Sequence, residues 1–141
     1  MHVTLATALI AIFSALALLH IYWALGGRWA FEGALPTEGG RPVFVPGPGA
    51  SAAVAIALLM AGAVCGLQAG VLTSGFPAWL PHLGVWGVSF VFAARAVGEF
   101  RYVGFFKRVQ GTVFARRDSR FYSPLCMAIS LLAAGLALTS P

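Results

Sequence analysis

Four long apolar segments, separated by short polar stretches, restrict the folds open to this sequence. Each is close to the roughly 17–25 residues that an α-helix needs to cross a membrane. Of the 141 residues, 60% are hydrophobic and only 9% are charged, whereas a soluble domain carries about 25% charged residues. The sequence therefore predicts one all-α membrane domain, residues 1–141, with four transmembrane helices in a bundle. The predicted spans are about 3–25, 50–72, 82–100 and 123–139.

The basic residues predict how these spans are oriented. Apart from Arg95, every Lys and Arg lies in segments 26–49 and 101–122, and the N-terminus, residues 73–81 and the C-terminus carry none. Short cytoplasmic loops are enriched in Lys and Arg. We therefore expect both basic segments to be cytoplasmic loops and both termini to lie outside.

The 101–122 segment is the most strongly charged part of the chain. Its basic residues alternate with apolar ones, which predicts a helix at the level of the lipid headgroups or a continuation of the third span. The apolar residues at helical spacing are Tyr102, Phe105, Phe106, Val109 and Val113. Given this pattern, the net charge of +5 favours membrane lipids, especially anionic headgroups at the cytoplasmic face, as partners. We expect no binding to nucleic acid. Ser123 and Pro124 suit the cap and first turn of the fourth span.

Two glycine-rich features leave alternatives open. Segment 26–49 is rich in Gly and Pro and cannot continue as a helix. It either packs over the mouth of the bundle or remains a free surface loop. Gly62, Gly66 and Gly70 recur every four residues, a spacing that lets helices approach closely. These glycines either pack within the monomer or form a contact with a second copy or a partner subunit.

Arg95 and Glu99 lie one helical turn apart inside the third apolar segment. An ionisable side chain at membrane depth costs on the order of 2.5–3.5 kcal/mol. Such side chains are expected to face a protein interior, a partner or a water-filled pocket. A rise of 1.5 Å per residue places His20, near the end of the first span, at a similar depth. The groups expected just outside this layer are Asp118, Arg120 and Tyr122.

This polar layer has two interpretations. In the first, it is a pocket for a small anionic or amphiphilic ligand such as a lipid or quinone, and His20 and Glu99, which could move a proton, are the catalytic candidates. In the second, it is an interhelical salt-bridge network in a non-catalytic accessory or assembly subunit, with Glu99 pairing with Arg95 or Arg101. The ligand-binding candidates are Arg95, Arg101, Asp118, Arg120, Tyr122 and Trp23. No residue spacing predicts a metal site, no cofactor is identified, and whether the chain is an enzyme stays open.

Three segments carry a resemblance to a known family. They are His20–Gly27 (HIYWALGG), Arg95–Lys107 (RAVGEFRYVGFFK) and Phe114–Cys126 (FARRDSRFYSPLC). With them, the chain resembles a bacterial domain-of-unknown-function family of small four-helix integral membrane proteins. The resemblance implies four spans and a bacterial inner (plasma) membrane, and it supplies no activity, ligand or catalytic residue.

Overall fold

The computed structural model describes residues 1–140 and contains four helical runs long and apolar enough to cross a membrane. Three are α1 (His2–Ala24), α2 (Pro48–Gln68) and α3 (Trp79–Val97). The fourth, Val113–Thr139, is called the C-terminal helix here. It consists of α4 (Val113–Arg117), the π-helical turn η2 (Asp118–Tyr122) and α5 (Ser123–Thr139). The prediction of an all-α protein with four transmembrane helices is confirmed.

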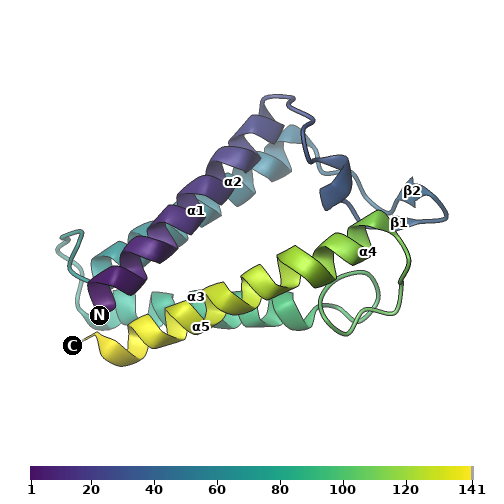
Figure 1. The fold of residues 1–141 in the computed structure, drawn as a ribbon. Helices are drawn as coiled ribbons and strands as arrows, with labels where there is room; N and C mark the ends of the chain where they lie inside the picture. The colour runs from purple at the N-terminus through teal and green to yellow at the C-terminus, as the bar shows by residue number, and fades with distance from the viewer. Residues whose placement is uncertain (141) are drawn as a thin grey trace.

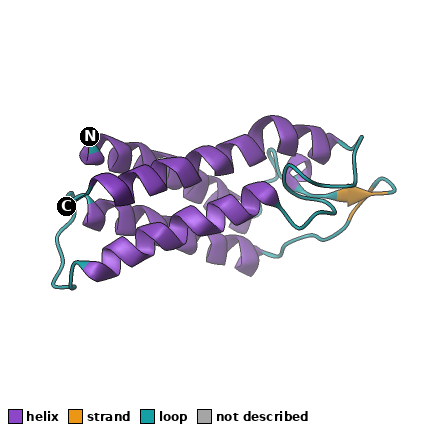
Figure 2. Cartoon of the chain, turned by 90° about the horizontal axis from the view of Figure 1, so that it is seen from below, coloured by secondary structure: helices purple, strands orange, loops and turns teal. Residues whose placement is uncertain are grey.

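The helices associate as two antiparallel pairs, α1 with α2 and α3 with α5 (Figure 1). The pairs lie close together near the chain termini and separate toward the opposite end (Figure 1). Figure 2 shows both termini at one end of the molecule. The first loop (residues 25–47) and the third loop (residues 98–112) lie at the other end, which we call the loop end.

Apolar side chains on one face of each helix form the core. On α1, the fully buried Ala6, Leu9, Phe13 and Ala17 recur every three or four residues, which places them on one helix face. Phe13 packs against Phe92 of α3, with ring centroids 5.5 Å apart. The core therefore joins the two pairs. The other fully buried apolar positions are Cys65, Val85, Ala96, Ile129, Ala133 and Leu136.

Glycines allow α1 and α2 to approach closely. A Cβ on Gly62 would lie 3.5 Å from Cβ of Phe13, and a Cβ on Gly66 would lie 3.4 Å from Cδ1 of Ile10. Both glycines are buried within α2. Of the two interpretations of this spacing, the structure supports packing within the chain for Gly62 and Gly66. Gly70 follows α2 with a φ of 71°, a common conformation for the glycine that ends a helix.

Between residues 101 and 112, the structure has a folded loop where the spacing predicts helix. α3 ends before Gly98, which has a φ of 84°, and the chain turns again at Gly104, with a φ of 90°. A Cβ on Gly98 would collide with the carbonyl oxygen of Val103, and a Cβ on Gly104 with that of Val97. The helical prediction is wrong here because these two glycines allow the two halves of the turn to meet backbone to backbone.

The C-terminal helix begins ten residues before the predicted span. Thr112 caps it, since its Oγ1 accepts a hydrogen bond from the Ala115 amide at 3.0 Å. Proline has no N–H and its ring clashes with the carbonyl four residues earlier. The wide π-helical turn ends two residues before Pro124, and it is the local distortion that lets the helix continue past this residue. Ser123 therefore lies inside a helix and does not cap one.

The first loop is ordered and packs against the C-terminal helix. It contains a 3-10 turn, η1 (Glu32–Ala34), and two short antiparallel strands, β1 (Thr37–Glu38) and β2 (Arg41–Pro42), with Thr37 opposite Pro42. The Tyr122 hydroxyl of η2 donates to the carbonyl of Gly33 at 3.2 Å. Of the two interpretations of this segment, the structure supports packing over the ends of the helices.

A pair of glycine substitutions tests the third loop. Gly111 also has a positive φ, 82°, but nothing would lie within 4 Å of its Cβ. Gly111→Ala should cost only about 1 kcal/mol, the penalty for a left-handed residue. Gly104→Ala should lower the unfolding free energy by a larger amount, because backbone atoms obstruct its Cβ. Denaturant unfolding of both variants in detergent measures this difference, and equal costs would contradict the packing described.

Candidate functional site

The Asp118 carboxylate is the centre of a buried polar cluster at the loop end. Its Oδ1 accepts a hydrogen bond from Nη2 of Arg95 at 3.0 Å. Its Oδ2 accepts from Nζ of Lys107 at 3.0 Å, from the Gly104 amide at 2.8 Å and from Oγ of Ser123 at 3.1 Å. Asp118 is fully buried. One carboxylate therefore connects α3, the third loop and the C-terminal helix, and we call this set of residues the Asp118 cluster.

Lys107 supplies the second positive charge of the cluster, and its side chain is completely buried. Besides Asp118, its Nζ donates to the carbonyl of Gly104 at 2.8 Å and to Oγ of Ser119 at 2.7 Å. The ammonium group thereby uses all three of its donors, the condition under which a buried ion pair is tolerated. The sequence predicts no role for Lys107, because a lysine in a basic loop ordinarily points to water.

Arg95 pairs with Asp118 and not with Glu99. Within residues 1–140, the Glu99 carboxylate makes no ion pair with either Arg95 or Arg101, so the expected pairing is wrong. Glu99 instead accepts hydrogen bonds from three backbone amides of the turn after it, which satisfies donors that a continued helix would have paired. These donors belong to Arg101, Tyr102 and Val103. Glu99 is therefore a structural residue of the third loop.

A second charged contact joins the two loops at the surface. The Tyr102 hydroxyl donates to Oε2 of Glu38 at 2.6 Å, and Nη2 of Arg101 lies 3.4 Å from the same oxygen. The Tyr102 hydrogen bond, together with the Arg101 guanidinium, lowers the pKa of Glu38 below its usual 4.5. The same hydrogen bond raises the pKa of Tyr102. Tyr102 and Arg101 together therefore hold β1 against the third loop.

His20 lies in a separate environment on α1. Its Nδ1 donates to the carbonyl of Leu16 at 2.8 Å, and its ring packs edge-on against Trp23, with centroids 4.9 Å apart. His20 and Trp23 line an apolar cavity between α1, the first loop and the start of α2, and no residue of the Asp118 cluster lines it. His20 therefore does not share a cavity with Arg95.

The remaining candidates lie on the C-terminal helix. Arg120 is exposed, and its guanidinium lies 5.5 Å from the ring centroid of Phe121. Tyr122 packs against Phe114 and bonds the first loop. The structure thus brings the predicted residues together in pairs and not in one layer. The pairs in direct contact are Arg95 with Asp118, Glu99 with Arg101, and His20 with Trp23.

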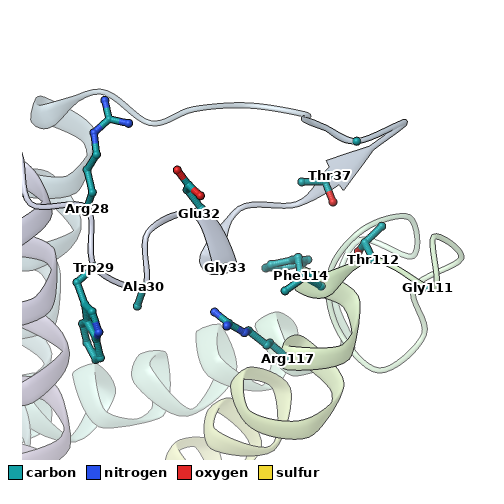
Figure 3. Close-up of a pocket in the computed structure, with 12 residues that line it drawn as sticks. Arg28, Trp29, Ala30, Glu32, Gly33, Thr37, Gly111, Thr112, Phe114 and Arg117 are labelled. Atoms are coloured by element: carbon teal, nitrogen blue, oxygen red, sulfur yellow. The ribbon is translucent and has the colours of Figure 1, made fainter.

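A cavity of about 780 Å³ lies between the first loop and the start of the C-terminal helix. Arg28 and Arg117 both line it, and we call it the arginine cavity. Figure 3 shows Arg117 projecting from α4 toward Gly33, and Arg28 on the side nearer α1. Within residues 1–140, neither arginine has a carboxylate at ion-pair distance. The sequence indicates only an orientation role for both arginines, because their shared position at one cavity depends on how the first loop packs.

The first turn of the C-terminal helix also lines the arginine cavity, through Val113 and Phe114. The first four amides of a helix have no partner inside it, and Thr112 caps only that of Ala115. Free amides and the helix dipole favour negative charge at this position. Together with the two arginines, they form a set of groups suited to a phosphate or a carboxylate.

Comparison with known proteins gives the family of this chain. The family model described as "Protein of unknown function (DUF3995)" matches residues 13–133. The chain belongs to this family, so the expected membership of a domain-of-unknown-function family is confirmed. Neither the curated proteins nor the solved structures contain a match to the chain.

Asp118→Asn should destabilise the protein strongly. The variant leaves the buried Lys107 without a counter-charge, and breaking a buried ion pair costs about 3–5 kcal/mol. Adding Lys107→Met to it should recover part of this loss. Glu99→Gln, whose amide oxygen can still accept hydrogen bonds, serves as the control with a smaller effect. Thermal unfolding in detergent compares the variants, and a wild-type unfolding temperature for Asp118→Asn would contradict the structural role of the cluster.

The Glu38 contact should be lost in acid. Because the folded pKa is lowered, this contact is fully present above pH 4.5 and is lost as the pH falls through the lowered value. An NMR titration of the Glu38 side chain should give a midpoint below 4.5. Tyr102→Phe removes the main cause of the shift, so it should raise this midpoint. A midpoint that the substitution leaves unchanged would count against the hydrogen bond.

Proposed function

We propose that this member of the DUF3995 family is a multi-pass protein of the bacterial inner membrane that binds a small anionic amphiphile at its cytoplasmic face. The arginine cavity is the proposed binding site. The observation that carries the proposal is that Arg28 and Arg117, neither with a carboxylate partner in residues 1–140, line the same cavity. A guanidinium pairs well with phosphate and carboxylate because its N–H donors match their geometry.

The position of Arg117 depends on Gly33 of the first loop. A Cβ on Gly33 would collide with the guanidinium of Arg117, so the arginine lies directly against the backbone of η1. Tyr122 donates to the carbonyl of the same glycine. Docking of the first loop therefore both forms one side of the cavity and positions one of its cations. Glu32 also lines the cavity. With the two arginines and Glu32 ionised, the lining has a net charge of +1, which favours an anionic head.

Two aromatic side chains support an amphiphilic ligand over a fully polar one. Trp29 and Phe114 line the arginine cavity, and the Trp29 side chain is 73% exposed. Tryptophan is enriched where a protein meets the membrane surface. An alkyl or acyl tail beside such rings could remain in the bilayer while its head contacts the arginines.

The distribution of charge supports a cytoplasmic position for the cavity. The two loops that carry basic residues lie together at the loop end, and the termini lie at the other (Figure 2). The positive-inside rule then assigns the loop end to the cytoplasm. The competing function, an accessory subunit that contacts a partner through the α2 glycines, is less favoured because Gly62 and Gly66 already pack near Phe13 and Ile10 of α1.

Binding of an alkyl phosphate tests the proposal. Protein purified in dodecyl maltoside should bind mono-dodecyl phosphate, measured by isothermal titration calorimetry. Arg28→Gln and Arg117→Gln should each weaken binding about tenfold, since each removes a charge-assisted hydrogen bond. Arg116→Gln is the matched control, because Arg116 is adjacent in sequence but bonds the Gly111 carbonyl and does not line the cavity. Equal affinities for all four proteins, or no binding to the wild type, would contradict the proposed site.

A further inference from the structure

We propose that the apolar cavity beside His20 binds the phenol or quinol head of a membrane-dissolved molecule, with His20 as hydrogen-bond acceptor. This His20 cavity is separate from the arginine cavity, and the inference does not depend on the proposed function. Glu32 and Gly33 line the arginine cavity, whereas Phe31 and Ala34 line the His20 cavity. The η1 turn therefore separates the two.

The His20 cavity has the size and lining of a site for one ring. Its volume is about 240 Å³, and no charged residue lines it. It lies between the last turns of α1, the first loop and the first turns of α2, near the end of the predicted membrane spans. The large apolar side chains around it are Trp23, Phe31, Leu35, Phe44 and Val54. Such a lining favours a planar apolar group over an ion.

His20 offers one unused nitrogen at this cavity. The Leu16 carbonyl can only accept, so the proton lies on Nδ1, and Nε2 of the neutral ring is an acceptor. Within residues 1–140, the side-chain hydrogen bond of His20 is the one made by Nδ1, and Nε2, which is not among the buried atoms that lack a partner, is accessible. His82 provides a contrast, because its Nε2 accepts from Nε1 of Trp86 at 3.2 Å. The one acceptor nitrogen of a neutral His82 ring is therefore already used, whereas His20 keeps its acceptor for a ligand.

Ser51 is a second polar group at the same cavity. It lies in the first turn of α2, is only 4% exposed and lines the cavity. Its hydroxyl makes no hydrogen bond within the part of the chain that the structure describes, residues 1–140. Ser51 Oγ is not among the buried side-chain atoms that lack a partner, so it is accessible from outside the protein. A ligand oxygen in the cavity could therefore pair with it.

These groups select the ligand class. A ring hydroxyl would donate to Nε2 of His20, and a second ring oxygen, as in a quinol, would pair with Ser51. The aromatic and aliphatic lining would cover the ring. A phosphate or carboxylate head would find no cation here, and a sugar would leave several hydroxyls unpaired, which is costly in an apolar site. A phenol or quinol with an alkyl tail satisfies all of these conditions.

Two probes that differ by one hydroxyl test the inference. The protein in lipid nanodiscs is titrated with 4-hexylphenol and with hexylbenzene, and binding is measured by equilibrium dialysis. The wild type should bind 4-hexylphenol at least fivefold more tightly, as expected for one additional hydrogen bond. His20→Phe keeps the ring but removes the acceptor, so this preference should fall below twofold. His82→Phe is the matched control and should keep the preference.

A preference that persists in His20→Phe, or its absence from the wild type, would overturn the inference. If His20→Phe does not fold, the ¹⁵N NMR signal of Nε2 in wild-type His20 gives the answer. It should shift when 4-hexylphenol is added and stay in place when hexylbenzene is added. The same response to both probes would overturn the inference. Because neither probe carries a charge, these results are independent of alkyl phosphate binding.

Discussion

The Asp118 carboxylate is the interaction on which the loop end depends. It accepts hydrogen bonds from α3 through Arg95, from the third loop through Lys107 and Gly104, and from α5 through Ser123. Taking a carboxylate out of water is unfavourable. The attraction of nearby cations outweighs this penalty only when hydrogen bonds also satisfy the remaining lone pairs of the carboxylate. The start of the C-terminal helix is thereby held beside α3. That helix in turn presents Arg117 and Tyr122 to the first loop.

Each loop contributes to more than one contact. The first loop docks through Gly33 on the C-terminal helix and through Glu38 on the third loop. Its η1 turn then separates the arginine cavity from the His20 cavity. We propose three distinct roles for the polar residues of this membrane protein. The Asp118 cluster stabilises the fold, the two unpaired arginines could hold an anion, and His20 could accept a hydrogen bond from a neutral ring.

The four helices could be predicted from sequence because length and hydropathy alone decide which segments cross a membrane. The pairing of Arg95 with Asp118 could not, since it requires a π-helical turn and a loop reversal that leave no periodic signal. The helical spacing from Tyr102 to Val109 was misleading, because Gly98 and Gly104 reverse the chain regardless of the residues between them. From the sequence, Arg28 and Arg117 indicate only positive charge, because their position at one cavity depends on tertiary packing of a Gly- and Pro-rich loop.

Amide hydrogen exchange at Gly104 tests the central role of Asp118 most directly, because this amide donates to the carboxylate. In the wild type it should be protected, and in Asp118→Ala it should exchange at least a hundredfold faster. Core amides of α1, such as that of Phe13, should speed up by a smaller factor, because they keep their hydrogen bonds within the helix. Unchanged exchange at Gly104, or an equal increase throughout α1, would contradict the account.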